Sequence, residues 1–300
     1  MKKNRLGASE LIVGEIGLGC MSLGTEERKA TALVHEALEL GVNFLDTADL
    51  YDGGRNEELV GKAIRGRRDR VVLATKVGNR RIAGQDGWVW DPSRKHILSA
   101  VKESLRRLGT DYIDLYQLHG GTIDDPIDET IEAFEQLKRE GVIREYGISS
   151  IRPNVIREYA ARSSAVSVMN PYSIVDRRAE EAVLPLLEEK GIGVIARGPL
   201  ASGALAANRQ PVKGVPDYEL PELIALRDGL EALTTPERSL TQLAIRYSLS
   251  HPAVAVAIPG ASSREQLLQN VAAANAPELT EEEVRTVHRL SKANVYALHR

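Results

Sequence analysis

The 300-residue sequence has a single cysteine, Cys20, and few aromatic side chains, which make up 4% of the chain. One cysteine excludes an intrachain disulfide and any metal site built from several thiolates. No apolar run approaches the roughly 20 residues that a membrane-spanning helix needs. The opening residues 1–19 include basic side chains, but glycine, serine and glutamate interrupt the apolar core that a secretory signal requires. We therefore expect a cytoplasmic protein with no membrane segment.

An excess of charge of either sign is also lacking. The 39 Lys and Arg residues nearly balance the 42 Asp and Glu residues, for a formal net charge of −3. Proteins that bind nucleic-acid backbones usually concentrate positive charge, so we expect no nucleic-acid partner. The composition does not indicate an oligomer, and a monomer is the default expectation.

Short apolar, β-branched runs alternate with amphipathic helical segments over most of the chain. Several runs are apolar without strict alternation, which is typical of parallel strands covered on both faces. The predicted strands are 15–19, 42–48, 70–76, 112–119, 146–150, 165–170, 193–198 and 253–260. Eight strands, each followed by a helix, predict a (β/α)8 TIM barrel of the α/β class, with one domain over residues 1–300.

Three segments fall outside the eight repeats. Residues 1–14 belong to a predicted N-terminal hairpin that closes one end of the barrel, with its turn at GASE. Residues 204–222 form a predicted long loop after strand seven, and residues 279–300 a C-terminal helix and tail. Thr280 and Glu283 fit a capping box at the start of that helix.

Helix ends are also predicted from single residues. Asn56 and Asp91 fit helix N-caps, the latter followed by a proline. The glycines expected to end helices in the left-handed conformation are Gly41, Gly66, Gly109 and Gly141.

The segment GLGCMS at 17–22 offers a competing interpretation, because it nearly matches the dinucleotide-binding pattern G-x-G-x-x-G. However, Ser22 occupies the third glycine position and Gly24 interrupts the expected start of the helix. Eight alternating units also exceed the usual doubly wound sheet. The barrel is therefore favoured over a Rossmann domain.

Four polar side chains follow three successive predicted strands. Asp46 ends the second strand, Tyr51 lies in the loop behind it, and Lys76 and His119 end the third and fourth strands. Each residue alone has an ordinary explanation, as a cap, a wall residue, a surface lysine or a core histidine. In a barrel the carboxyl ends of neighbouring strands lie about 4.8 Å apart on one face. One geometry therefore explains all four residues as a single site.

These four groups form a chemically sensible proton-donating site. A free tyrosine has a pKa of about 10, and a neighbouring lysine cation makes the phenol a better acid. An aspartate keeps the buried lysine charged, and a histidine can orient a carbonyl oxygen. The site could thus polarise a C=O group and protonate the developing alkoxide as a hydride arrives.

With these motifs in place, the whole chain resembles the aldo-keto reductases. LDTADLYDGGRNEELVGKAI, VVLATKVG and DYIDLYQLHG resemble the family's segments that hold the aspartate and tyrosine, the lysine and the histidine. The resemblance implies a catalytic tetrad of Asp46, Tyr51, Lys76 and His119, with Tyr51 as the general acid. It also implies reduction of small aldehydes or ketones with NADPH (NADP+ after turnover), NADH being possible, bound in the barrel mouth.

The resemblance further implies a set of cofactor-binding positions. The set comprises Gly19, Cys20, Met21, Ser149, Ser150, Asn170, Arg197, Gly198, Leu200, Ser202, Gly260, Ser262, Arg264, Gln266 and Asn270. Ser150 stands where the family has asparagine, and Asn170 where it usually has glutamine. Arg197 occupies the position of an aromatic residue that stacks on the nicotinamide, a role that a planar guanidinium can also serve. Arg264 is the cation nearest to the expected 2′-phosphate.

Substrate choice is expected to depend on loops, since these form the barrel mouth. The loop 78–93 holds Trp88 and Trp90, which either line an apolar substrate pocket or pack on the barrel rim. Two other functions are possible: a nucleotide-binding regulatory barrel with little turnover, and an aldolase or lyase that forms a Schiff base at Lys76. The physiological carbonyl compound is not evident from the sequence.

Overall fold

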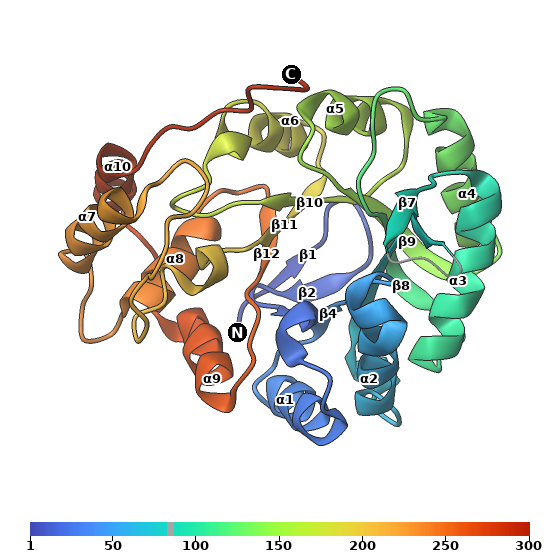
Figure 1. Cartoon of the computed structure of the whole chain (residues 1–300), viewed down its shortest axis with the longest axis horizontal. Helices are drawn as coiled ribbons and strands as arrows, with labels where there is room; N and C mark the ends of the chain where they lie inside the picture. The colour runs from blue at the N-terminus through green and yellow to red at the C-terminus, as the bar shows by residue number, and fades with distance from the viewer. Residues whose placement is uncertain (83–86) are drawn as a thin grey trace.

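Eight parallel strands form one sheet that closes into a barrel (Figure 1). The computed structural model describes residues 1–82 and 87–300. The strands, in their order around the sheet, are β3 (Leu18–Gly19), β4 (Phe44–Asp46), β5 (Val72–Val77), β8 (Ile113–Leu118), β9 (Ile143–Ser149), β10 (Ser167–Pro171), β11 (Gly193–Arg197) and β12 (Val254–Ile258). Parallel bridges from Ile16 to Ala257 and from Gly19 to Gly260 join the first strand to the last. The predicted (β/α)8 fold is confirmed.

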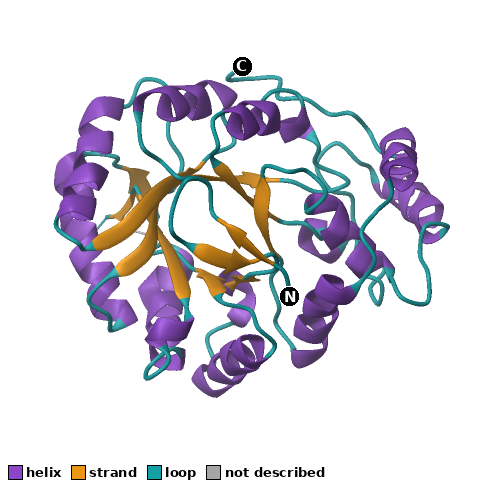
Figure 2. Cartoon of the chain, turned by 180° about the vertical axis from the view of Figure 1, so that it is seen from behind, coloured by secondary structure: helices purple, strands orange, loops and turns teal. Residues whose placement is uncertain are grey.

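A ring of helices surrounds the strands (Figure 2). The helices are α1 (Glu27–Glu39), α2 (Arg55–Ala63), α3 (Arg94–Leu108), α4 (Ile127–Arg139), α5 (Pro153–Arg162), α6 (Val183–Glu189), α7 (Leu220–Glu231), α8 (Leu240–Ser248), α9 (Arg264–Ala272) and α10 (Glu281–Leu290). Each amphipathic helix turns its apolar positions inward, as α1 does with Leu33, Val34 and Ala37. Among the described residues no helix has both the length and the apolar character to cross a membrane.

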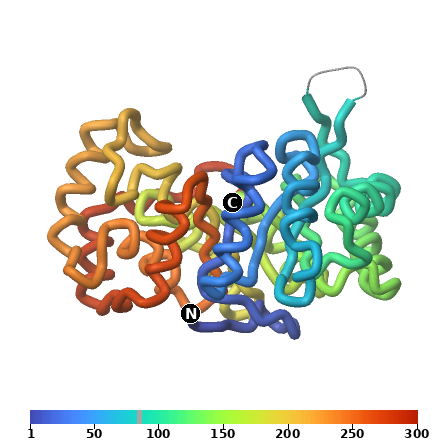
Figure 3. The backbone as a smooth tube through the Cα atoms, turned by 90° about the horizontal axis from the view of Figure 1, so that it is seen from below, coloured from blue at the N-terminus to red at the C-terminus, as the bar shows by residue number. Residues whose placement is uncertain are grey.

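The N-terminal hairpin closes one end of the barrel. Strands β1 (Lys3–Arg5) and β2 (Ile12–Gly14) pair antiparallel, and the turn falls at the predicted position. Leu6, Leu11 and Val13 are buried in a cluster with barrel-interior side chains such as Phe44 and Leu115. Figure 3 shows this hairpin at the opposite end of the molecule from the projecting segment that contains Trp88–Trp90.

That projecting segment is a second hairpin rather than an irregular loop. Strands β6 (Asn79–Arg81) and β7 (Trp88–Trp90) pair antiparallel. Part of the predicted loop 78–93, residues 83–86, lies outside the described residues.

One segment in the C-terminal half of the chain differs in detail from its prediction. After β11, the 3-10 turn η5 (Ala201–Gly203) leads into the excursion, but α7 begins at Leu220, so the predicted loop 204–222 ends in a helical turn. Glu219 and Glu222 form the capping box that starts this helix. Beyond α10 the tail runs back toward α5 and α6 (Figure 1), where Asn154 N donates to the carbonyl of His299 at 2.9 Å.

Helix caps were predicted with mixed success. The capping box of Thr280 and Glu283 is confirmed, and Gly109 is the left-handed C-cap of α3. Gly41, Gly66 and Gly141 have the expected positive φ but lie one or two residues past their C-caps. The N-cap predictions for Asn56 and Asp91 are wrong, because α2 begins earlier, after Gly54, and α3 later, after Ser93. Those caps are set by a left-handed glycine and by a serine side chain that accepts from His96 N.

Candidate active site

The four predicted catalytic side chains come from neighbouring strands at one end of the barrel. Asp46 is the last residue of β4, Lys76 lies near the end of β5, and His119 directly follows β8. Tyr51 begins the 3-10 turn η2 (Tyr51–Gly54) behind β4. Because β4, β5 and β8 are adjacent in the sheet, the structure brings the four residues together.

The ammonium group of Lys76 is the centre of this arrangement. Its Nζ donates to Asp46 Oδ2 at 2.7 Å, to the carbonyl of Thr47 at 2.7 Å and to the hydroxyl of Tyr51 at 3.2 Å. Lys76 is fully buried and Asp46 is 3% exposed. A buried charge needs such partners, since an isolated ammonium in this environment would lose its proton.

The surroundings set the protonation states of the lysine and the phenol. Burial opposes the charge of Lys76, but Asp46 and then Tyr51 outweigh it and raise the pKa of the lysine. Burial also raises the pKa of Tyr51, and the nearby lysine cation opposes that rise. The phenol is therefore protonated at neutral pH, with a cation in place to stabilise the phenolate that forms when it gives up its proton.

His119 completes the group as a neutral imidazole. Its ring lies edge-on to Tyr51, with centroids 6.0 Å apart and an interplanar angle of 84°. Burial, reinforced by the cations of Lys76 and Arg197, lowers the pKa of His119 to about 3. A neutral imidazole in this position can orient a carbonyl oxygen without competing for the proton of Tyr51.

A cavity of about 650 Å³ opens beside the tetrad. Asp46 and Tyr51 line its inner end, and the walls come from the ends of β3, β11 and β12. The predicted cofactor positions that line it are Gly19, Met21, Arg197, Gly198, Leu200, Ser202, Gly260, Ser262 and Gln266. Most of the positions proposed from the family resemblance thus share one cavity with Asp46 and Tyr51.

Six other predicted positions do not line this cavity, and the polar groups of several form hydrogen bonds within the protein. The Cys20 thiol is buried and donates to the carbonyl of Leu18 at 3.6 Å. Asn170 donates to the carbonyl of Ser150 at 2.7 Å and accepts from the Tyr296 hydroxyl at 3.0 Å. Ser149, Ser150 and Asn270 are likewise absent from the lining, and Asn270 donates to the Gly260 carbonyl at 3.1 Å.

Arg264, the sixth, is held away from the cavity by an ion pair. Its guanidinium contacts the carboxylate of Glu36 on α1 at 2.7 Å and 2.9 Å. Arg209 instead lines the cavity, beside Gly203, and forms no ion pair within the described part of the chain. The sequence did not single out Arg209, because the loop that holds it has no regular periodicity.

The two tryptophans occupy different environments. Trp88 is 53% exposed on β7. Trp90 is partly buried, with its ring packed on Gly78 and Gly120 and its Nε1 donating to Asp125 at 3.0 Å. Neither lines the cavity beside the tetrad. Trp90 therefore stabilises the hairpin on the barrel rim in this structure.

Two further residues, which no sequence motif indicates, support the four predicted catalytic side chains. Gln117 donates to Asp46 Oδ1 at 3.3 Å. Asn56, inside α2, accepts from the Thr47 hydroxyl and donates to the carbonyl of Cys20, which ties the end of β4 to the first strand. Asn56 was misassigned as a cap because its buried, inward position depends on where the helix begins.

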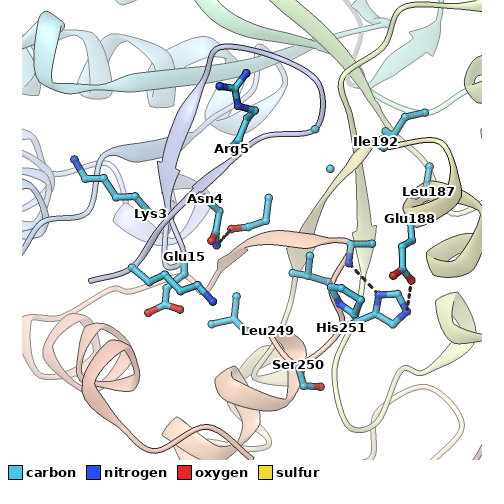
Figure 4. Close-up of a pocket in the computed structure, with 18 of the residues that line it drawn as sticks. Lys3, Asn4, Arg5, Glu15, Leu187, Glu188, Ile192, Leu249, Ser250 and His251 are labelled. Carbon is cyan, nitrogen blue, oxygen red and sulfur yellow. Dashed lines mark hydrogen bonds and ion pairs between the residues drawn. The ribbon is translucent and has the colours of Figure 1, made fainter.

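A second cavity of about the same volume lies at the N-terminal end of the barrel, by the hairpin (Figure 4). Lys3, Asn4 and Arg5 line it on one side and His251 on the other, and a buried ion pair of Arg246 with Glu15, at 3.0 Å, contributes to its wall. None of its described lining residues belongs to the tetrad. The chemistry described above therefore belongs to the first cavity alone.

Comparisons with known proteins agree with this geometry. A model of the Aldo/keto reductase family matches residues 15–292. The chain belongs to the aldo/keto reductase family. It is 56% identical over its full length to the full-length "Uncharacterized oxidoreductase YqkF" of Bacillus subtilis (strain 168), and 32% identical over 89% of its length, and 84% of the relative, to "Aldo-keto reductase YhdN" of the same organism.

Among solved structures, the holo form of aldo-keto reductase AKR11C1 from Bacillus halodurans is similar, with a TM-score of 0.95 and 57% identity over 100% of this chain and 99% of that one. The apo form of the same protein has a TM-score of 0.87. Aldo-keto reductases are oxidoreductases that act on small carbonyl compounds with a nicotinamide cofactor, and the predicted family and enzyme class are confirmed at this level.

Proposed function

We propose that this aldo-keto reductase reduces aldehydes or ketones to alcohols, with Tyr51 as the general acid and with Lys76, Asp46 and His119 assisting it. The supporting observation is the placement of the Lys76 ammonium between the Asp46 carboxylate and the Tyr51 hydroxyl, at 2.7 Å and 3.2 Å. A bound nicotinamide cofactor would supply the hydride that adds to the carbonyl carbon.

The residues of the chain supply the proton and the orientation. The phenol of Tyr51 gives its proton to the carbonyl oxygen as that oxygen gains charge, and the resulting phenolate is stabilised by Lys76. Asp46 keeps Lys76 charged throughout. The neutral imidazole of His119 donates a hydrogen bond to the substrate oxygen. The cavity lined by Arg197, Ser202 and Ser262 would hold the dinucleotide.

Replacing Tyr51 with phenylalanine tests this assignment. The variant loses the proton donor and leaves the cavity walls intact, so kcat should fall by orders of magnitude with little change in the cofactor Kd. Tyr112→Phe is the matched control, because Tyr112 lies at the opposite end of β8 from His119, where its ring contacts the guanidinium groups of Arg68 and Arg144. If Tyr51→Phe keeps near wild-type turnover of an aldehyde panel, another group supplies the proton.

The alternative of Schiff-base chemistry at Lys76 is disfavoured by the same contacts. A nucleophilic amine must be neutral and accessible, whereas Lys76 is fully buried, charged and bonded to three oxygen atoms. Borohydride trapping in the presence of substrate distinguishes the two, since only an imine leaves a covalent adduct. NADPH oxidation with a panel of aldehydes tests the regulatory alternative, which predicts negligible turnover.

NADPH is proposed as the preferred cofactor, with NADH possible, and Arg264 was the first candidate for the 2′-phosphate. Its ion pair with Glu36 makes Arg209 a competing candidate, since Arg209 lines the cavity without such a partner in the described residues. Loss of a guanidinium that binds the 2′-phosphate should raise KM for NADPH about ten- to a hundredfold and leave KM for NADH nearly unchanged. Measuring both constants for Arg264→Ala and Arg209→Ala identifies which arginine, if either, selects NADPH.

A further inference from the structure

Gln117 is a fully buried polar side chain in the barrel interior. It lies on β8, in register with Lys76 on β5. Two residues earlier on the same strand, Leu115 packs in the apolar interior cluster with Phe44 and Met169. Burying an apolar side chain of similar size here would cost less free energy, because a buried amide must be satisfied by hydrogen bonds.

Among the described residues the amide of Gln117 has one hydrogen-bond partner, which is the aspartate of the proposed tetrad. Its Nε2 donates to Asp46 Oδ1 at 3.3 Å, while Lys76 Nζ donates to Asp46 Oδ2 at 2.7 Å. Each oxygen of the carboxylate thus has its own donor, from a different strand. The Oε1 of Gln117 has no hydrogen-bond partner among the described residues. Since an ionised carboxylate only accepts hydrogen bonds, the NH2 side of the amide must face Asp46.

We propose that Gln117 is a positioning residue of this active site, which keeps Asp46 ionised and turned toward Lys76. It acts on Tyr51 only through that ion pair, and the inference rests on the proposed function. The hydrogen bond itself supports this role, because among the described residues the Gln117 Nε2 donates to the Asp46 carboxylate and to no other acceptor.

Several other groups act on Asp46, and Gln117 is the uncharged donor among them. Lys76 faces it from β5, Arg197 from β11 and Tyr51 from η2. The neutral Cys20 thiol is also close, in the 3-10 turn η1 (Cys20–Leu23). Burial raises the pKa of Asp46, whereas Lys76, Gln117 and Arg197 each lower it. Removing the amide should therefore favour the protonated carboxyl.

Gln117→Met tests this role, because methionine keeps the length of the side chain and removes the donor. With the hydrogen bond lost, the acidic limb of the pH profile of kcat should move upward by about one pH unit, a tenfold change in the ionisation constant. The Kd of NADP+, measured by calorimetry, should remain unchanged. Leu115→Met is the matched control, since it alters the same interior face of β8 without removing a polar group.

Gln117→Glu adds a signature that altered packing cannot produce. Its carboxyl can donate to Asp46 only while protonated, and two facing carboxylates share one proton. The kcat of this variant should therefore rise toward low pH, opposite to the trend for Gln117→Met. Circular dichroism and thermal melting establish that each variant is folded before its profile is compared.

The outcomes separate the inference from the function on which it rests. If the wild-type protein reduces no carbonyl compound with NADPH or NADH, the proposed function fails. If the wild type is active and both Gln117 variants keep its pH profile, only the inference is overturned. A shift of equal size in Leu115→Met would also overturn it, by showing that the profile responds to interior packing.

Discussion

Removing the charge of Lys76 should destabilise the barrel as well as inactivate it. In Lys76→Met, Asp46 stays buried at 3% exposure without the ammonium that lies 2.7 Å from its Oδ2. Breaking a buried ion pair by deleting one partner typically costs roughly 3–5 kcal/mol. The Thr47 carbonyl also loses its donor. Since whole domains are stable by about 5–15 kcal/mol, this single change should remove a large part of the stability.

The double variant Lys76→Met/Asp46→Leu removes both charges of the buried pair. Replacing both partners of a buried pair with apolar groups of similar volume is often neutral, or stabilising by about 1–4 kcal/mol. The double variant should therefore recover most of the stability lost in the single variant, although it remains inactive. Stability would be measured by urea denaturation at pH 7, followed by circular dichroism, with the midpoint and m-value compared across the series.

Two results would refute this reasoning. A midpoint for Lys76→Met close to that of the wild type would mean that Asp46 is not left as an uncompensated charge. A double variant less stable than Lys76→Met would mean that the two side chains do not act as a pair. Agreement with the prediction would show that the ion pair adds little net stability, which favours a chemical reason for its presence.

Three other predictions concern titration and packing. His119, with its pKa lowered to about 3, should stay neutral between pH 8 and 5 when its ring proton signals are followed by NMR; titration near 6.5 would contradict this. Burial, reinforced by the Glu57 carboxylate, raises the pKa of Asp49 to about 7, so the folded state keeps a proton that the unfolded chain releases. The free energy of unfolding should therefore fall by at most roughly 4 kcal/mol as the pH rises from about 4 to 7. In Asp49→Asn this dependence on pH should be weaker, as measured by urea denaturation at pH 5 and pH 8. Gly61→Ala should lower the free energy of unfolding by about 1–3 kcal/mol in the same assay, although alanine is the better helix former. The reason is that the alanine Cβ would lie 2.3 Å from the Leu108 carbonyl oxygen. Unchanged stability would show that α2 and α3 can separate freely.

The barrel could be predicted from the sequence because its signals are local. Each strand is a short apolar run beside an amphipathic helix, so its existence and type depend on neighbouring residues. The tetrad was predictable for the same reason, since Asp46, Lys76 and His119 each end or follow such a run. The topology of the fold then determines that these chain positions meet.

The remaining parts of the site depend on contacts that no local pattern contains. Arg264 pairs with Glu36, which lies 228 residues earlier in the chain, so its distance from the cavity could not be anticipated. The start of α2 depends on a left-handed turn at Gly53 and Gly54, which moves Asn56 from the expected cap into the helix interior.

The position of Gln117 shows why a buried polar residue is informative once the fold is known. Within the run YIDLYQLH, the sequence does not reveal whether this side chain points into the barrel or toward the helices. The register with Lys76 places it inside, where every buried polar atom must be accounted for. An amide whose one hydrogen-bond partner among the described residues is the aspartate beside Lys76 is then better explained by the proposed chemistry of the site than by packing.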